Sequence, residues 1–126
     1  MSKHKVYAYR EKGGTSPVKA WLQNLPHKVY AKAAARIERL EEQGHQLRRP
    51  EADYLRDGIY ELRWGFQNVN YRLLYFFHGR EIIVLAHGLT KENRVPDRDI
   101  EQALKHKEAF ETNPDLHSEE FSLEEE

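Results

Sequence analysis

The sequence predicts an α+β fold, in which two N-terminal helices pack on a small, mostly antiparallel sheet and another helix follows near the C-terminus. Residues 16–43 carry apolar side chains at helical spacing. Residues 58–91 contain three short runs of β-branched, aromatic and leucine side chains, separated by turn residues. Residues 98–110 show a second, weaker helical pattern. With 126 residues and no internal repeat, the chain has the length of one domain with a real core.

The first expected helix begins at Ser16, because serine is a favoured N-cap and proline, here Pro17, suits the first helical position. Pro26 ends this helix, since proline lacks the N–H that a continuing helix needs. Its apolar face has i, i+3, i+4, i+7 spacing and consists of Val18, Trp21, Leu22 and Leu25.

The second expected helix spans about His27 to Gln43, and Gly44 suits its C-terminal cap. Its apolar stripe consists of Val29, Ala33, Ile37 and Leu40. The opposite face is basic and carries Lys28, Lys32, Arg36 and Arg39. Such a face is either solvated surface or part of a functional site, and both interpretations stay open.

The three apolar runs between Gly58 and Lys91 predict a three-stranded antiparallel meander, and residues 5–10 alternate like a further strand. Glu61 and Arg63 share one face of the first run, because successive strand residues face opposite sides. Arg72 interrupts the second run. Buried arginine needs a partner, so either Glu61 pairs with one arginine or the face is solvated, or the arginines converge on a concave anion-binding site. We expect this site on a sheet face that the helices leave partly open.

The segments around the meander are less regular. Residues 45–57 are expected to form a loop, where Arg48 and Arg49 are either phosphate contacts or surface charge. The last helix is expected over residues 98–110, with Asp97 as a candidate cap.

Charge is distributed unevenly along the chain. The formal net charge is −1, yet residues 1–110 carry +6 and residues 111–126 carry −7. The sequence therefore predicts a basic domain over 1–110 and an acidic, disordered tail over 111–126. The tail is either a solvated appendage or an electrostatic decoy over the basic face. A basic body suits a polyanionic partner.

Several classes of function are excluded or disfavoured by composition. Cysteine is absent, so neither a disulfide framework nor a thiolate metal site is possible. The apolar runs are too short to span a membrane, the N-terminus lacks the apolar segment of a secretory signal, and a cytoplasmic protein is expected. No phosphate-cradling glycine loop, dinucleotide fingerprint or nucleophile elbow occurs. Two scattered imidazoles near the sheet, His78 and His87, make a poor metal site, so we expect no metal or other cofactor.

The remaining polar residues suit metal-free cleavage of RNA. In that reaction a base deprotonates the ribose 2′-hydroxyl, an acid protonates the leaving 5′-oxygen, and guanidinium groups stabilise the phosphorane. His87 is the expected general acid or base because its ordinary pKa lies near neutrality. The full candidate set is Glu61, Arg63, Arg72, His87, Lys91 and Arg94.

Several short motifs, taken in order, resemble the phage-derived, HigB-like branch of the RelE/ParE toxin superfamily over about residues 5–110. They are Ser16-Pro17, Trp21-Leu22, Leu25-Pro26, Arg36-Ile37 to Leu40, Gly58 to Arg63, Tyr71 to Tyr75, His87-Gly88, Thr90-Lys91 and Pro96. The resemblance implies a RelE-type fold and a type II toxin. Such a toxin is an endoribonuclease that cleaves mRNA at the ribosome, and a helix-turn-helix antitoxin neutralises it.

The resemblance also implies roles for individual residues. The sheet arginines of the family correspond to Arg63 and Arg72, its glutamate to Glu61, and its basic residue after the last strand to Lys91. Arg63 and Arg72 are expected to hold the scissile phosphate, and Glu61 to act as a base or to orient an arginine. Apart from the resemblance, the basic character of Lys91, Arg94, Arg48 and Arg49 leads us to expect that these residues contact flanking RNA.

One departure leaves other functions open. This branch often has two lysines after the last strand, whereas this chain has Lys91-Glu92, and a carboxylate there weakens binding of an anionic substrate unless Arg94 compensates. One alternative is a ParE-like inhibitor of DNA gyrase, which acts by binding. The other is a non-catalytic protein-binding module of the same fold.

Overall fold

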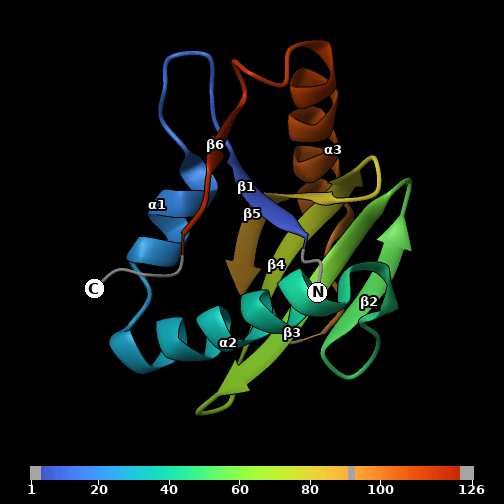
Figure 1. Cartoon of the computed structure of the whole chain (residues 1–126). Coiled ribbons are helices and arrows are strands. Elements are labelled where there is room, and N and C mark those ends of the chain that lie inside the picture. Colours follow the sequence, from blue (N-terminus) through green and yellow to red (C-terminus); the bar gives the residue numbers. More distant parts are fainter. Residues whose placement is uncertain (1–3, 91–92, 123–126) are drawn as a thin grey trace.

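The structure, a computed structural model, describes residues 4–90 and 93–122. These residues form an α+β fold, with one six-stranded, mostly antiparallel sheet and three α-helices (Figure 1). This confirms the predicted class. The elements are β1 (Lys5–Tyr9), α1 (Pro17–Gln23), α2 (His27–Gln43), the 3-10 turn η1 (Gly44–Gln46), β2 (Ala52–Arg56), β3 (Ile59–Phe66), β4 (Val69–His78), β5 (Ile82–Thr90), α3 (Asp97–Thr112) and β6 (Ser118–Glu120).

The sheet has the strand order β2-β3-β4-β5-β1-β6. Strands β1 and β5 run parallel, and the other neighbouring pairs are antiparallel. The expected meander is confirmed as β3, β4 and β5. Strand β1 precedes both helices, however, so the order differs from that of two helices at the N-terminus followed by a sheet. Strand β1 pairs with β5 on one side and with β6 on the other, so the N-terminal strand lies inside the sheet and not at its edge.

Local signals determine the first two helices. Ser16 Oγ accepts a hydrogen bond from the backbone N–H of Lys19 at 3.3 Å, as expected of an N-cap, and Pro17 is the first helical residue. Helix α2 has the predicted bounds. Gly44 ends it with φ at 54°, a conformation that favours glycine, and a side chain there would collide with the ring of His4.

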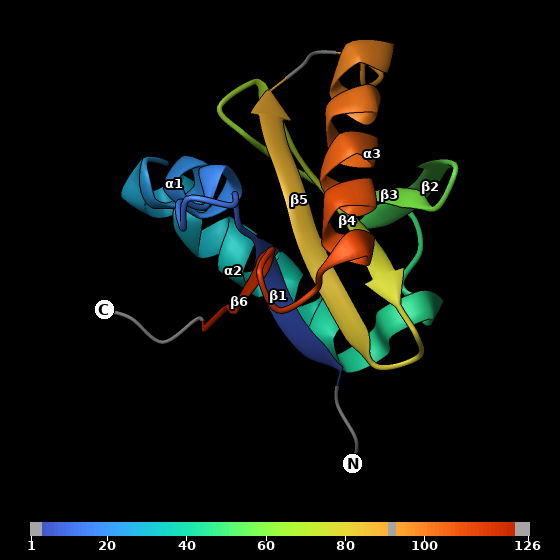
Figure 2. The same cartoon turned by 90° about the horizontal axis from the view of Figure 1, so that it is seen from above.

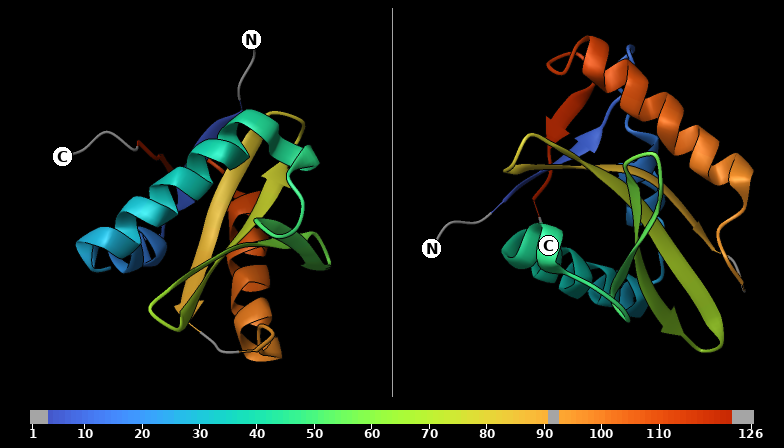
Figure 3. Two further views of the ribbon diagram at one scale, coloured as in Figure 1. Left: turned by 90° about the horizontal axis from the view of Figure 1, so that it is seen from below. Right: turned by 90° about the vertical axis from the view of Figure 1, so that its right-hand side faces the viewer.

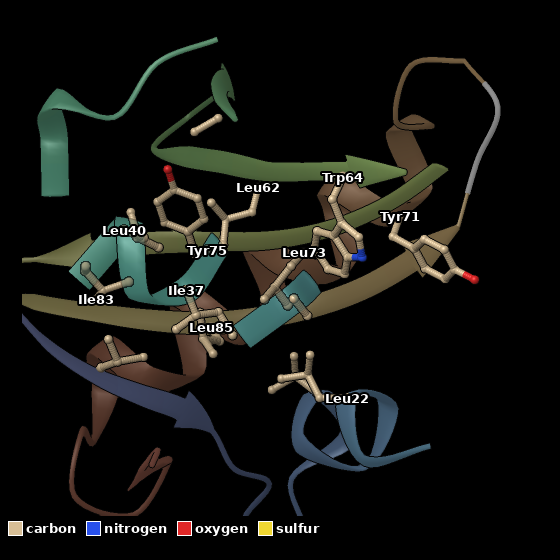
Figure 4. Packing of buried hydrophobic residues seen from close by; sticks show 14 of the residues in the cluster. Leu22, Ile37, Leu40, Leu62, Trp64, Tyr71, Leu73, Tyr75, Ile83 and Leu85 are labelled. Carbon is tan, nitrogen blue, oxygen red and sulfur yellow. The ribbon is translucent and has the colours of Figure 1, made fainter. Parts of the chain in front are cut away.

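Each face of the sheet has its own core, and helices cover both faces (Figures 2 and 3). Helices α1 and α2 cover the first core, whose packing is shown in Figure 4. Helix α3 covers the second core, so the face that was expected to be partly open is largely closed. From α3, Ile100, Ala103 and Phe110 pack against Ile59, Leu74, Phe76, Val84 and Ala86 of the sheet.

A β-bulge in β5 sets the direction of His87. Leu74 of β4 pairs with His87, but the next residue, Tyr75, pairs with Leu85, so Ala86 is an extra residue in β5. After the bulge, His87 points to the α3 face, where it meets Asp99. A strand without the bulge would place Ala86 and His87 on opposite faces.

Three regions differ from the sequence prediction. The expected loop over 45–57 contains β2, which pairs with β3. Helix α3 starts at Asp97 after Pro96, and no side chain caps it. The tail that was expected to be disordered from residue 111 first completes α3 and then forms β6, which pairs with β1. Of the helices in the described ranges, none is long and apolar enough to cross a membrane.

Candidate functional site

A cleft of about 500 Å³ opens at the edge of β3, beyond the point where β2 begins. Its walls come from α2, the loop before β2, strands β3 and β4, and the loop after β5. Five arginines line it, together with one carboxylate and several neutral groups. These residues are Arg36, Arg49, Arg63, Arg72 and Arg94, with Glu61, Pro50, Trp64, Gly65, Asn70 and Asn93.

Sheet register explains why three of the charged residues meet. Arg63 of β3 and Arg72 of β4 are direct cross-strand partners, so their side chains lie on the same face. Glu61 lies two residues before Arg63 and therefore shares that face. The side chain of Arg72 is 8% exposed, whereas that of Arg63 is 25% exposed. Arg72 thus forms the floor of the cleft, and Arg63 lies nearer to solvent.

Glu61 is the shared counter-ion of both arginines. Its Oε1 lies 3.0 Å from Arg72 Nε, and its Oε2 lies 3.9 Å from Arg63 Nε. The Arg72 Nε–H is not aimed at the carboxylate, so this close contact is an ion pair without a good hydrogen bond. The sequence left ion pairing and convergence in a concave site as alternatives, and the structure shows both together.

Burial changes the acid–base properties of this pair. Desolvation raises the pKa of Glu61, although the positive charges of Arg72 and Arg63 oppose that shift. Desolvation also lowers the pKa of Arg72, and Glu61 opposes that shift. Within the part of the chain that the structure describes, Nη1 and Nη2 of Arg72 donate to the carbonyls of Tyr71 and Asn93 at 3.4 Å, which is long for a hydrogen bond. An anion in the cleft would therefore accept better hydrogen bonds from Arg72 and stabilise its buried charge.

The outer arginines are also held by carboxylates or carbonyls. Arg36 Nε donates to the carbonyl of Arg63 at 2.8 Å, and its Nη1 lies 3.6 Å from Glu51. Arg39 donates two hydrogen bonds to the same Glu51, which lower the pKa of that carboxyl. Arg49 pairs with Asp53 at 2.9 Å. These contacts orient the guanidinium groups and partly neutralise the cleft.

Most of the predicted site residues come together here, with some exceptions. Arg48 does not line the cleft, because its guanidinium donates to the carbonyl of His45. Lys91 lies outside the described residues. Arg36 was expected only as part of the basic face of α2. Its place in the cleft results from a contact with Arg63, which lies 27 positions along the chain, and no local pattern signals that contact.

His87 lies apart from the cleft. Glu61, Leu74 and His87 form one row across β3, β4 and β5, so Glu61 and His87 are separated by two strand spacings, roughly 10 Å, with buried Leu74 between them. A ring nitrogen of His87 lies 2.8 Å from Asp99 Oδ1 at the start of α3. The arrangement joins His87 to α3 instead of to the arginines.

A metal-ligand cluster is not found within residues 4–90 and 93–122, where no three His, Asp or Glu side chains are grouped for an ion. The cleft itself offers guanidinium groups, which bind anions, and a single carboxylate among its lining side chains. What it can do chemically is hold a phosphate and supply a base beside it.

Comparison with known proteins adds a family. No curated protein matched the chain significantly. The sequence profile described as "Phage derived protein Gp49-like (DUF891)" matches residues 20–108. The matched segment runs from α1 into α3 and contains every residue that lines the cleft, while β1 and β6 lie outside it. Since this match covers most of the sequence, the chain belongs to the phage-derived Gp49-like family, a RelE/toxin-like family.

Proposed function

We propose that the protein is the toxin of a type II toxin–antitoxin system and a metal-free endoribonuclease that cleaves mRNA, at the ribosome, to arrest translation. Membership of a RelE/toxin-like family supports the toxin role. The observation that carries the proposal is the pair of facing guanidinium groups, Arg63 and Arg72, beside buried Glu61 in one cleft. We place the protein in the HigB-like branch on its sequence motifs.

Arg63 and Arg72 bind the scissile phosphate in this proposal. Guanidinium groups contact phosphate oxygens in a bidentate manner, and their value increases where water is excluded. Arg72 is fixed at the floor of the cleft and stabilises the charge that develops on the phosphorane. Arg36, Arg49 and Arg94 line the outer cleft and hold the flanking phosphates, which carry no sequence information by themselves.

Glu61 takes the role of general base, because it is the carboxylate of the cleft and His87 lies too far away. Burial raises its pKa, which makes the ionised form a better proton acceptor. Glu61 removes the proton from the ribose 2′-hydroxyl, and the 2′-oxygen forms a bond to phosphorus. The bond from phosphorus to the 5′-oxygen breaks, and that oxygen takes a proton from solvent in the open outer cleft.

A protein antitoxin is the expected partner, since a toxin-like family implies one at a coarse level. We propose a helix-turn-helix antitoxin whose acidic side chains compete for the arginines of the cleft. Such a partner would compete with the internal carboxylates Glu51, Asp53 and Glu61 for the arginines of the cleft, and would block RNA by occupying the same guanidinium groups.

The proposal is tested by induced expression in a bacterial host, with mapping of new mRNA 5′ ends. The variants are Arg63→Gln and Arg72→Lys, with Arg80→Gln in the exposed β4–β5 turn as the matched control. Arg72→Ala is unsuitable as a variant, because Arg72 is buried and ion-paired and the change would leave Glu61 without its closest partner. We expect cuts within translated frames for wild type and Arg80→Gln, and at least about 100-fold fewer for the two cleft variants.

The same experiment separates the other functions. Growth arrest without RNA cuts would overturn the endoribonuclease and favour a ParE-like gyrase inhibitor. Unchanged RNA cutting by Arg63→Gln would show that the cleft is not the active site. One observation favours a non-catalytic binding module as the second candidate, namely that Arg36, Arg49, Arg63 and Arg72 already have carboxylate partners. If neither the wild type nor any variant caused growth arrest or RNA cutting, that result would support the binding module.

A further inference from the structure

Five aromatic rings form a continuous series at the β2 edge, on the face of the sheet opposite to the cleft floor. We call this series the aromatic ladder. Tyr60 is its centre, with ring centroids 4.9 Å from Tyr54, 5.4 Å from Tyr75 and 5.2 Å from Phe77. His45, which follows α2, stacks on Phe77 at 3.6 Å and completes the ladder. Tyr75 is buried in the first core, so the ladder extends from the core to the surface.

Tyr54 is the outer end of the ladder and is unusually exposed for a large apolar residue. It is 52% exposed, and among the described residues Val69 is the other large hydrophobic residue classed as exposed, at 40%. The Tyr54 ring cannot move freely, because its hydroxyl accepts a hydrogen bond from the N–H of Gly58 at 3.1 Å and its ring packs on Tyr60. A planar ring held in place presents its free surface to a ligand at little entropic cost.

Two arginines of the loop before β2 contact residues near the two ends of the ladder. Asp53, the residue before Tyr54, holds Arg49 by an ion pair of 2.9 Å. Arg49 also lines the cleft, and its side chain remains 67% exposed. Arg48 is exposed next to it and bonds the carbonyl of His45, at the other end of the ladder. The loop 48–50 therefore links the arginine cleft to the aromatic ladder around the open edge of the sheet.

An exposed aromatic ring with guanidinium groups in the neighbouring loop suits single-stranded nucleic acid. Bases stack on aromatic faces while the backbone follows positive charge, and every base offers a flat face, so the contact does not depend on sequence. A protein partner would instead need a larger continuous apolar patch, whereas the exposed apolar surface here is mainly that of one ring.

We propose that the exposed face of Tyr54 is a base-stacking subsite for single-stranded RNA, with Arg48 and Arg49 as the phosphate contacts that connect it to the cleft. This inference rests on the proposed function, because it takes RNA as the substrate. The RNA strand passes around the β2 edge, so that a base flanking the scissile phosphate lies on Tyr54. The subsite supplies affinity for RNA and takes no part in bond cleavage.

The test is binding of a fluorescein-labelled 2′-O-methyl hexanucleotide, which has no free 2′-hydroxyl within the chain and is not cut. An abasic hexamer with the same backbone is the comparison. We expect Tyr54→Leu to weaken binding of the base-bearing hexamer by about tenfold, the usual effect of losing one base stack. Tyr54→Phe keeps the flat ring and should bind within about threefold of wild type. Val69→Ala, at the other exposed apolar residue, should bind like wild type.

The abasic hexamer should bind equally to all four proteins, because their phosphate contacts are unchanged. Equal affinity of wild type and Tyr54→Leu for the base-bearing hexamer would overturn the proposal. So would equal binding of the two hexamers by wild type, or no binding of either. Affinity of Tyr54→Phe for the base-bearing hexamer as low as that of Tyr54→Leu would also overturn it, because binding would then depend on the hydroxyl contact to Gly58 and not on the ring. Loss of antitoxin binding alone in Tyr54→Leu would assign the surface to a protein.

Failure of the endoribonuclease proposal would show differently. In that case Arg63→Gln would leave cellular RNA cleavage unchanged or cleavage would be absent, while the difference between the two hexamers would persist. The two inferences are therefore tested by separate measurements.

Discussion

Arg72 keeps its charge in a place that water scarcely reaches, and Glu61 is the reason that this is tolerable. Removing one member of a buried ion pair costs much more than replacing both, because the remaining charge stays buried without a partner. The two members are not equivalent. A carboxylate whose pKa is already raised by burial can escape the penalty by taking up a proton, whereas a guanidinium group cannot.

Glu61→Leu should therefore destabilise the fold more than Arg72→Met. We expect a loss of about 3–5 kcal/mol for Glu61→Leu and a smaller loss for Arg72→Met, with much of the stability recovered in the double variant. Urea unfolding at pH 7 measures all three. In Arg72→Met the pKa of Glu61 stays raised in the folded state, so the folded protein binds a proton more readily than the unfolded chain does. Lower pH therefore stabilises this variant, and its loss of unfolding free energy relative to wild type should be smaller at pH 5 than at pH 7. Equal losses in both single variants would contradict this account.

His87 illustrates a residue that was predicted for catalysis and lies elsewhere. Its ring is directed by the bulge at Ala86 toward Asp99. We expect His87→Asn to retain RNA cleavage within about twofold, and to lose at most about 1 kcal/mol of stability through the partly exposed contact with Asp99. The cellular cleavage assay and urea unfolding measure these two effects. A loss of cleavage as large as that of Arg63→Gln would return His87 to the catalytic site.

Among the elements, α3 has a polar anchor as well as an apolar face. His106 is buried, and its Nδ1 lies 2.8 Å from the carbonyl of Ala86 in the bulge, so that nitrogen is the donor. Its Nε2 lies 2.9 Å from Gln102 and 3.8 Å from Glu11, and its ring stacks on Tyr9 at 4.0 Å. This anchor holds the helix at the point where the bulge makes the backbone carbonyl available.

The pH dependence of stability follows from this anchor. Burial lowers the pKa of His106 from its ordinary value of 6.5, although the backbone contact and Glu11 oppose the shift. Just below pH 6.5, His106 therefore binds a proton in the unfolded chain but stays neutral in the folded state. The free energy of unfolding should decrease as the pH falls below 6.5 and should not change through His106 above that pH. His106→Gln, compared with wild type by urea unfolding between pH 5 and 8, should show a weaker dependence. Burial also lowers the pKa of His45, so His106→Gln should still lose some stability as the pH falls.

Elements with local signals could be predicted from the sequence, and those that depend on distant partners could not. Ser16 marks the start of α1 through its side-chain cap, and Gly44 marks the end of α2 through its positive φ, so both were placed correctly. The end of α1 was not, because the helix stops at Gln23 and Pro26 instead precedes the first residue of α2. Strand β6 is acidic and three residues long, and nothing local favours a strand there. It forms because β1 offers an unpaired edge and because Lys19 pairs with Glu119 at 3.1 Å. For the same reason, Glu61, Arg63 and Arg72 were found through strand alternation, whereas Arg36 required the packing of α2 against β3.

At the scale of the whole molecule, the acidic tail and the basic cleft lie at opposite edges of one sheet. The cleft lies at β3 and β4. The described part of the tail contains β6, which lies on the far side of β1 from these strands (Figure 1). Four strand spacings separate β6 from β3, roughly 19 Å in the direction across the sheet. Strand β6 therefore does not cover the cleft as an electrostatic decoy would. What remains is a long-range field, which salt screens within about 10 Å at 0.1 M ionic strength.

Truncation after Thr112 should separate these two effects of the tail. It removes six acidic residues and changes the formal net charge from −1 to +5. It also removes β6 and the packing of Phe121 on the first core, so we expect about 2 kcal/mol lower stability by urea unfolding. Because the cleft stays intact and the field extends further in dilute salt, association with the base-bearing hexamer should be faster than for the full chain at about 10 mM salt. At 150 mM salt the two rates should agree.

A variant that keeps β6 but changes the terminal triplet, Glu124→Gln/Glu125→Gln/Glu126→Gln, separates charge from structure. Its association rate at low salt should lie between those of the full chain and the truncated chain, because it removes half of the six charges. A gain in rate that persisted for the truncated chain at 150 mM salt would mean that the tail blocks the cleft by contact, since a screened field cannot act over the width of this sheet. The tail would then be an autoinhibitory segment, and β6 would have to leave β1 for it to reach the arginines.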